Sequence, residues 1–289
     1  MRMKAWLVVN HYLNSEKFNE LNSLLTDAGA RLGIALDVKT NAEILSSLTI
    51  CGGKDLDLPD FVLFWDKDIT LCRMLESLGL PVFNSSRAIA SCDNKGLTHA
   101  ILLGAGIKMP RTVIAPLSFK KEDLSDFTAR AAEKLGFPLI IKESFGSFGA
   151  QVYLAEDIVE AVDIANSISP SQMIFQEFVA SSKGRDIRIH VVGDAVVASM
   201  ERVSERDFRA NVTRGGKMRN YTPTEEEADI AVRAARALKL DFCGVDLLFG
   251  EDAPILCEVN SNAHIKNILD CTNVNVADHI FRYIKGKLS

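Results

Sequence analysis

Residues 243–260, C-G-V-D-L-L-F-G-E-D-A-P-I-L-C-E-V-N, decide the fold because they place two apolar runs around one turn. The turn is rich in Gly, Asp and Pro, which predicts two strands, 244–249 and 255–260, joined as a hairpin. The apolar residues that flank the acids are typical of a buried sheet. The stretch therefore predicts a buried antiparallel hairpin around which the rest of the chain is organised.

Two acids face each other in this predicted hairpin. An antiparallel register that sets Phe249 opposite Ile255 also sets Asp246 opposite Glu258, and Asn260 shares a face with Glu258 because side chains alternate along a strand. Opposed carboxylates repel each other, and a hard cation such as Mg²⁺, which prefers oxygen ligands, removes the conflict. A solvated hairpin edge with incidental acids is the alternative, and the apolar flanks favour a metal.

The composition describes a soluble globular protein of two or three domains, with 289 residues of which 47% are hydrophobic and 25% charged. A net charge of -5 gives no basic footprint for nucleic acid. No apolar run is long enough to cross a membrane, and residues 1–10 suit a buried strand better than a signal peptide. The six cysteines are scattered without a C-x-x-C pair, so we expect reduced thiols and a cytoplasmic protein.

Strands and helices alternate in the first ninety residues, which predicts a small α/β unit with a parallel sheet. The expected strands are 5–10, 61–65 and 81–84, and the expected helices are 18–32 and 71–78. Polar residues at the ends of such strands often bind ligands, although most are only turn formers. Three residues fit this description: Asn10, His11 and Asn84.

A loop with two glycines follows the predicted strand 137–143 and has phosphate-binding character. Its sequence is S-F-G-S-F-G-A over 144–150, and glycine lets backbone N–H groups approach phosphate oxygens closely. Lys142, at the end of the strand, supplies a counter-charge. The loop matches neither a Walker A motif nor a dinucleotide fingerprint, and a plain hairpin turn is the alternative.

Charged residues gather in a predicted hairpin over 186–203 and in the loop that follows it. The hairpin turns at Gly193-Asp194, and its first strand places three polar residues on one face: Asp186, Arg188 and His190. Arg202 and the loop add guanidinium groups that suit bidentate contact with phosphate or carboxylate: Arg202, Arg209 and Arg214. A solvated surface loop is the alternative.

The remaining predicted elements alternate in the same way. They are a helix within 91–106, a helix over 124–135, a strand over 151–155, a helix over 157–168, a strand over 173–179, a helix over 224–239 opened by the capping box T-E-E-E, a polar loop over 261–266 and a closing helix over 276–284. The strand 173–179 buries Glu177, and a lone buried acid requires a partner or a ligand.

Eight short motifs, in order and at consistent spacing, resemble the ATP-grasp ligases and, within them, the RimK-like α-L-glutamate ligases. They are D-N-K at 93–95, L-I-I-K at 139–142, Q-E-F-V at 176–179, G-R-D-I-R at 184–188, E-R at 201–202, D-F-R-A-N-V-T-R-G-G at 207–216, G-V-D-L-L at 244–248 and E-V-N at 258–260. Each alone is weak, but the set is specific. The resemblance covers nearly the whole chain.

The resemblance implies an α/β (α+β) ATP-grasp fold. An N-terminal Rossmann-like pre-grasp domain would span 1–90, a central ATP-grasp subdomain 91–176, and a C-terminal subdomain with the Mg²⁺ site 177–289. ATP would be clamped between the last two. By analogy with such enzymes, a homo-oligomer is expected.

The resemblance also implies roles for individual residues. The nucleotide would be bound by Lys95, Lys142, Gly146, Ser147, Gly149, Gln176, Glu177, Phe178, Val179, Asp186 and Arg188. The two lysines would contact phosphates, 176–179 would form the adenine hinge, and Asp186 would lie near the ribose. Two Mg²⁺ ions, with Mn²⁺ as an alternative, would be held by Asp246, Glu258 and Asn260. The catalytic residues would be Arg209 and Asn211, near the γ-phosphate, and Arg202, near phosphate or the substrate carboxylate.

The implied reaction is the ATP-dependent joining of a carboxylate to an amine. The carboxylate attacks the γ-phosphate of ATP, and an amine then displaces phosphate from the acyl phosphate. This reaction requires no covalent protein nucleophile, and none is evident in the sequence. Metal ions, Lys and Arg supply the positioning and charge neutralisation that phosphoryl transfer needs. The substrate would be L-glutamate, added to a peptide, protein or small-molecule acceptor. The alternatives are a ligase with another amino acid or a coenzyme acceptor, and a catalytically silent nucleotide-binding regulator.

The chain departs from the family after the metal motif. The family often has E-V-N-A-S-P-G, whereas this chain has E-V-N-S-N-A-H-I-K-N over 258–267. The exchange leaves the nucleotide chemistry intact and concerns the substrate. Our hypothesis is that His264 and Lys266 bind a carboxylate of the acceptor. The alternative is that they are polar residues on a surface loop without a ligand. The candidate substrate residues are Arg214, Asn262, His264 and Lys266.

Overall fold

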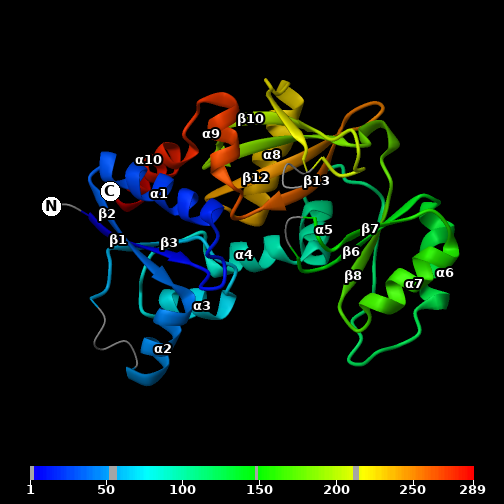
Figure 1. Ribbon diagram of the computed structural model, residues 1–289, viewed down its shortest axis with the longest axis horizontal. Coiled ribbons are helices and arrows are strands. Elements are labelled where there is room, and N and C mark those ends of the chain that lie inside the picture. Colours follow the sequence, from blue (N-terminus) through cyan, green and yellow to red (C-terminus); the bar gives the residue numbers. More distant parts are fainter. Residues whose placement is uncertain (1–2, 52–56, 147–148, 211–214) are drawn as a thin grey trace.

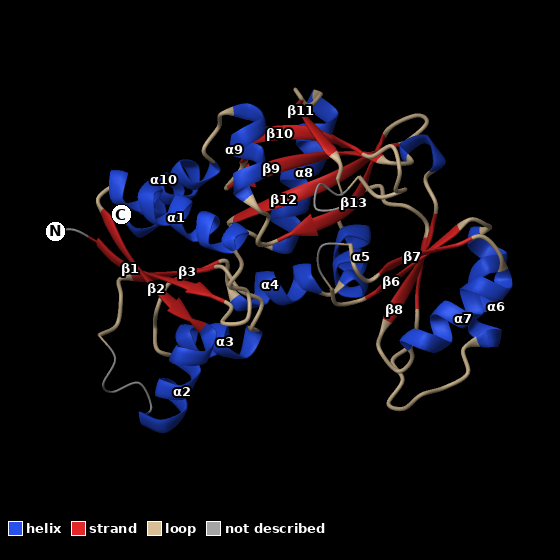
Figure 2. Cartoon of the chain, viewed as in Figure 1, coloured by secondary structure: helices blue, strands red, loops and turns tan. Residues whose placement is uncertain are grey.

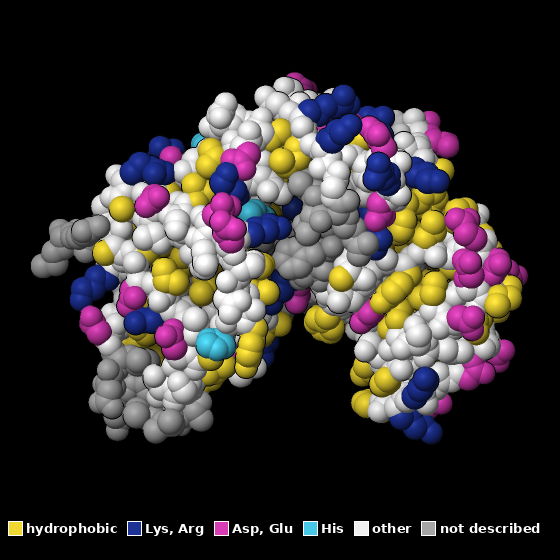
Figure 3. Space-filling view, viewed as in Figure 1, with side chains coloured by type: hydrophobic (Ala, Val, Ile, Leu, Met, Phe, Trp, Pro, Cys, Tyr) yellow, Lys and Arg dark blue, Asp and Glu magenta, His cyan; other side chains and the backbone are white. Residues whose placement is uncertain are grey.

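The computed structural model describes every residue except 1–2, 52–56, 147–148 and 211–214. For residues 49–51 it describes the backbone but not the side chains. Within this description the strands form three sheets, one parallel and two antiparallel (Figures 1 and 2). The lobe that carries the second sheet projects from the rest of the molecule, and a deep notch separates it from the N-terminal part (Figure 3). The predicted α/β fold is confirmed.

The N-terminal sheet is parallel, in the order β2-β1-β3-β4. Its strands are β1 (Met3–Val9), β2 (Ile34–Thr40), β3 (Phe61–Phe64) and β4 (Val82–Phe83), and its helices are α1 (Glu16–Arg31), α2 (Asn41–Cys51) and α3 (Ile69–Ser77). All four residues of β3 are buried, as expected for a central parallel strand covered on both faces. The sequence analysis missed β2 because an edge strand with exposed Asp37 and Val38 lacks a clear apolar pattern.

The second sheet is antiparallel, in the order β5-β8-β6-β7. It consists of β5 (Thr112–Ile114), β6 (Leu139–Glu143), β7 (Val152–Ala155) and β8 (Met173–Glu177). The helices α6 (Ser125–Leu135) and α7 (Ile158–Ile168) pack on it and share one apolar core with its strands. Lys142, near the end of β6, thus belongs to a compact lobe with its own core.

The third sheet is antiparallel, in the order β11-β10-β9-β12-β13. Its strands are β9 (Arg185–Val192), β10 (Ala195–Val203), β11 (Lys217–Asn220), β12 (Phe242–Phe249) and β13 (Pro254–Asn260). The helix α8 (Glu225–Leu238) packs on one face, and its predicted capping box between Thr224 and Glu227 is present. Two short helices, α4 (Ser86–Asp93) and α5 (Lys95–Gly104), lead from the first sheet to the second.

The hairpin that decides the fold forms with one correction to its register. Asp246 lies opposite Glu258, as predicted, but Phe249 lies opposite Pro254 rather than Ile255. The register shifts between Asp246 and Leu247, so that Cys257 is an extra residue on β13, as in a β-bulge. A bulge is a local irregularity that strand periodicity does not reveal.

The C-terminal helices pack against the N-terminal elements of the chain. The helix α9 (Ile265–Thr272) and the helix α10 (Val276–Leu288) share an apolar core with α1, β1, β3, β10 and β12. The predicted loop over 261–266 is therefore too long, because α9 starts at Ile265. The core joins both ends of the chain, and the domain boundaries at 90 and 176 stay predictions. Among the described helices, none is long and apolar enough to cross a membrane.

Candidate active site

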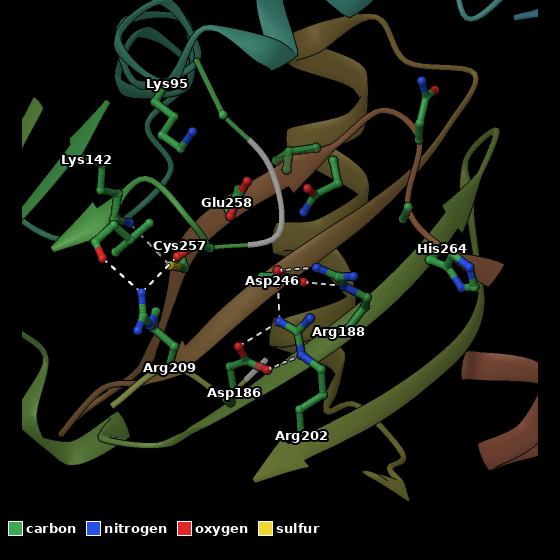
Figure 4. Close-up of a pocket in the computed structure, with 18 of the residues that line it drawn as sticks. Lys95, Lys142, Asp186, Arg188, Arg202, Arg209, Asp246, Cys257, Glu258 and His264 are labelled. Carbon is green, nitrogen blue, oxygen red and sulfur yellow. Dashed lines mark hydrogen bonds and ion pairs between the residues drawn. The ribbon is translucent and has the colours of Figure 1, made fainter. Parts of the chain in front are cut away.

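A cavity of about 390 Å³ lies where the three sheets meet, and most of the predicted site residues line it (Figure 4). The first sheet contributes Trp65 and Asp66 from the segment after β3. The second contributes Lys142, and the third contributes the polar face of β9, β10, β12 and β13. The chain thus brings together residues that are far apart in the sequence.

A row of four paired charges forms the floor of the cavity (Figure 4). On neighbouring strands, Arg202 lies opposite Asp186 and Arg188 lies opposite Asp246. Both pairs are bidentate, with N···O distances of 2.7 and 2.7 Å for Arg202–Asp186 and of 2.7 and 2.6 Å for Arg188–Asp246. Arg202 also reaches Asp246 at 2.9 Å. Two guanidinium groups therefore balance two carboxylates in a largely buried network.

The network shifts the acidity of its members. Burial by itself would raise the pKa of Asp246, but the ion pairs with Arg188 and Arg202 outweigh it and lower the pKa to about 2. Burial raises the pKa of Asp186, despite the opposing effect of Arg202. The pKa of Arg202 is raised, because the two carboxylates outweigh its burial. Asp246 consequently stays ionised throughout the neutral pH range.

The predicted metal ligands meet in part. Asp246 and Glu258 face each other across β12 and β13, and Asn260 follows on the same side. A carboxylate has about four lone-pair positions, and the guanidinium groups occupy three of those of Asp246, which leaves one on Oδ1. The carboxylate of Glu258 accepts no hydrogen bond from a described residue, and Asn260 Nδ2 is buried without one. These oxygens fit Mg²⁺, although two guanidinium groups already relieve part of the repulsion that we had assigned to a metal.

Across the residues that the structure describes, no three His, Cys, Asp or Glu side chains form a group that could hold a metal ion. A metal at this hairpin would therefore depend on the Asn260 amide and on oxygens from the substrate, which is the usual situation for Mg²⁺.

Two lysines lie above the floor. Lys95 starts α5, and its backbone N–H donates to Ser144 O at 2.9 Å, which joins α5 to the beginning of the Gly loop. Burial lowers the pKa of Lys95, with Glu258 acting in the opposite direction. Lys142 is only 8% exposed, and its ammonium lies 3.8 Å from Cys257 Sγ. Lys95 is half-buried, and two lysines that line an open cavity favour an anionic ligand such as a polyphosphate.

Arg209 joins the Gly loop to the third sheet. Its guanidinium donates to Gly149 O at 2.8 Å and to Val152 O at 3.0 Å, while Asp207 pairs with it at 2.9 Å. Gly146 and Gly149 line the cavity, and both have positive φ. Three predicted site residues lie outside the described part of the chain: Ser147, Asn211 and Arg214.

The predicted adenine hinge borders the cavity, with all four of its residues in the lining: Gln176, Glu177, Phe178 and Val179. The lone acid of this strand has a protein partner, because Arg111 pairs with the Glu177 carboxylate through its side chain and donates its backbone N–H at 2.8 Å. Gln176 donates to Thr112 Oγ1 at 2.9 Å. The groups of this segment that would contact the adenine base are therefore its backbone and the Phe178 ring.

The loop after the metal motif packs closely on β12. A Cβ atom on Gly244 would lie 2.5 Å from Ala263 Cβ, so the glycine of the G-V-D motif allows this approach. Asn262 and His264 line the cavity, and burial lowers the pKa of His264 to about 4. Lys266 is not among the lining residues, and its ammonium pairs with Asp270 one turn along α9.

The sequence analysis missed several cavity residues of the N-terminal part, among them Lys17, Asp66 and Lys67. Asp66 and Lys67 directly follow a predicted buried strand, and that position was the available signal. Of the polar strand-end residues that we singled out, only Asn10 lines the cavity. Asn84 is fully buried and bonds the backbone of Phe242 and Ser261, so it joins the first sheet to the third.

Comparison with known proteins agrees with this architecture. A family model for the RimK-like ATP-grasp domain matches residues 92–284. The uncharacterized protein MG012 of Mycoplasma genitalium is 33% identical over 276 residues, which are 93% of this chain and 95% of that protein. The ribosomal protein bS6–L-glutamate ligase of Escherichia fergusonii is 38% identical over 216 residues, which are 74% of this chain and 70% of that enzyme.

Solved structures share the fold. A RimK domain ATP-grasp protein from Sphaerobacter thermophilus superimposes with a TM-score of 0.75 at 19% identity, over 97% of this chain and 98% of that one. D-alanine–D-alanine ligase from Bacillus anthracis, solved with ATP, gives a TM-score of 0.75 at 16% identity, over 100% of this chain and 97% of that one. The chain belongs to the RimK-like ATP-grasp ligase family, which uses ATP and Mg²⁺.

Proposed function

We propose that this chain is an ATP-dependent carboxylate–amine ligase that adds L-glutamate to a peptide, protein or small-molecule acceptor through an acyl phosphate. The observation that carries the proposal is a single cavity lined by two lysines, the half-buried Lys95 and the buried Lys142, together with the carboxylates of Asp246 and Glu258. The identity to a relative named as an L-glutamate ligase supports the choice of glutamate.

In the first step, a substrate carboxylate attacks the γ-phosphorus of ATP, and ADP leaves. Lys95 and Lys142 would orient the phosphates by charge, while Arg209 would hold the Gly loop against them. Asp246, Glu258 and Asn260 would hold Mg²⁺, which supplies charge neutralisation for the transferred phosphoryl group when bound.

In the second step, the amine loses its ammonium proton to solvent and attacks the acyl carbon as the neutral base. The amide bond forms as the nitrogen releases a second proton, and phosphate leaves with the electron pair of the C–O bond and takes up that proton. The row of Arg188 and Arg202 is pre-organised by its own ion pairs, so it would offer positive charge to the leaving phosphate without rearrangement.

The experiment is to measure ADP release with Mg-ATP, L-glutamate and pools of candidate acceptors, with mass spectrometry of each product. A product heavier by one glutamyl residue is expected. ADP release only with another amino acid would keep the reaction class and overturn glutamate. Binding of ATP without ADP release in any pool would contradict the ligase proposal and favour a regulator.

A further inference from the structure

The wall of the cavity opposite the paired charges carries a single buried acid, Asp66. It follows β3 at the carboxyl edge of the parallel sheet, which is where ligands of α/β proteins usually bind. Asp66 is only 5% exposed, yet it lines the cavity. The ligase mechanism described above assigns no task to it.

One oxygen of Asp66 is satisfied and the other is not. Oδ1 accepts hydrogen bonds from Asn10 Nδ2 at 3.1 Å and from the Lys67 backbone N–H at 2.7 Å. Oδ2 is buried and has no hydrogen-bond partner among the described residues, although the side-chain amide of Asn41 lies near the carboxylate. No described Lys or Arg forms an ion pair with Asp66, and burial raises its pKa. A buried carboxylate oxygen of this kind requires a donor.

A second unsatisfied acceptor lies beside it. Asn262 donates through Nδ2 to the Asp66 backbone oxygen at 2.9 Å, while its own Oδ1 is buried without a partner among the described residues. Asn262 also lines the cavity. It follows Glu258 by four residues, and a chain rise of roughly 3.3 Å per residue keeps the two within about 13 Å.

Both oxygens have almost no exposed surface, so a ligand in the cavity would reach them after a rotation of the two side chains, which both line it. Such a ligand would have to donate several hydrogen bonds and carry a positive charge. An ammonium group has three donors and no acceptor, and it would compensate the charge of Asp66, whereas a water molecule would not. We propose that Asp66 and Asn262 bind the ammonium group of the amine substrate. The inference rests on the proposed ligase function.

The test compares Asp66→Asn with the wild-type chain in two assays. The variant keeps an oxygen for Asn10 and Lys67 but replaces Oδ2 by a neutral donor, so the fold is expected to persist. The first assay measures amide formation at varied concentrations of the amine, found by screening amino acids and short peptides with Mg-ATP. The second replaces the amine by hydroxylamine, which is uncharged at neutral pH and captures the acyl phosphate as a hydroxamate.

We expect kcat/KM for the amine to fall roughly 10- to 100-fold, mainly through KM, as for loss of a hydrogen bond to a charged group. Hydroxamate formation should stay within about twofold of wild type. Asn262→Ala should show a smaller loss in the same assay only. The matched control is Asp60→Asn, because Asp60 precedes β3 at the opposite edge of the sheet and accepts from the Lys4 backbone N–H at 2.8 Å.

Unchanged kcat/KM for the amine in Asp66→Asn would overturn the inference. An equal loss of amide and hydroxamate would also overturn it, because it would assign Asp66 to an earlier step or to folding, which a thermal unfolding curve checks. Wild-type protein that forms neither product would instead contradict the ligase activity itself.

Discussion

The two walls of the cavity are built on opposite principles. On the third sheet, each charge of the floor row has a partner of opposite sign on a neighbouring strand, as in Arg188–Asp246 and Arg202–Asp186. On the first sheet, Asp66 is buried with one oxygen unpaired among the described residues. The paired charges of the floor row hold one another in position, whereas the unpaired oxygen of Asp66 requires a hydrogen-bond donor from a ligand. The difference teaches that the floor row is held in place by its own ion pairs, whereas the position of Asp66 is completed by a ligand.

The largest expected effect is on activity at Glu258, which lies opposite Asp246 and has no hydrogen bond or ion pair with a described residue. Glu258→Gln removes a carboxylate that would hold Mg²⁺, so we expect ADP release to fall about 10²- to 10³-fold. The thermal unfolding temperature should change little, because no ion pair with the protein is lost. ADP release at several Mg²⁺ concentrations measures the effect, and a loss below tenfold would contradict the metal assignment.

Substitutions in the floor row should have their largest effect on the free energy of unfolding. Arg202→Met leaves Asp186 and part of Asp246 without their buried partner, which is expected to lower the free energy of unfolding by about 3–5 kcal/mol. Urea unfolding measures this loss. The control is Arg236→Ala, whose exposed pair with Asp194 is screened by solvent and should contribute far less than the buried row. Similar losses in both variants would show that the row is not a structural unit.

A smaller effect is expected where the Gly loop meets the third sheet. Arg209→Ala removes hydrogen bonds to Gly149 and Val152, so the loop loses an anchor. We expect kcat/KM for ATP to fall roughly tenfold, the scale of one hydrogen bond to a charged group, with little change in unfolding temperature. Exposed Arg206 provides the control as Arg206→Ala. Equal effects in the two variants would exclude a specific role for the Arg209 contacts.

The floor sheet also buries a histidine, which gives a pH-dependent test. Burial lowers the pKa of His190 from 6.5 to about 3. The unfolded chain therefore binds a proton first as the pH falls, and the free energy of unfolding should drop between about pH 6.5 and 3. His190→Gln should show a shallower drop than wild type in urea unfolding at several pH values, whereas exposed His11→Gln should follow wild type. Parallel curves for His190→Gln and wild type would contradict this.

The smallest expected effect concerns the loop that departs from the family. Lys266 pairs with Asp270 and does not line the cavity, so Lys266→Ala should change the KM of either substrate by less than about twofold. His264, which lines the cavity, should give the larger change as His264→Ala. An effect at His264 alone would limit carboxylate binding to His264. A larger effect at Lys266 would instead support the hypothesis that both residues bind a carboxylate of the acceptor.

Much of the fold could be predicted because its signals are local. The pairing of Asp246 with Glu258, the turn at Gly193-Asp194 and the capping box at Thr224 follow from spacings within a few residues, and each is present. The bulge at Cys257 was not predicted, because a bulge does not change the apolar periodicity clearly. The helix that starts at Ile265 was not predicted either, although Ile265, Ile268 and Leu269 have helical spacing, because the polar residues before it were assigned to a loop. The placement of Lys95 and Lys142 on one cavity followed from the family resemblance rather than from their spacing.

The sequence by itself determined most of the strands, but not β2, β5 and β11, together with the order of the motifs and the residues that make up each of them. Only the tertiary structure decided which charges meet, as in the contact of Arg111 with Glu177 across 66 residues and that of Asn262 with Asp66 across 196. The physical reason is that hydrophobic periodicity encodes local backbone geometry, whereas ion pairs and buried acceptors depend on the packing of distant segments. The paired floor and the unpaired acid beside it are therefore properties of the folded chain.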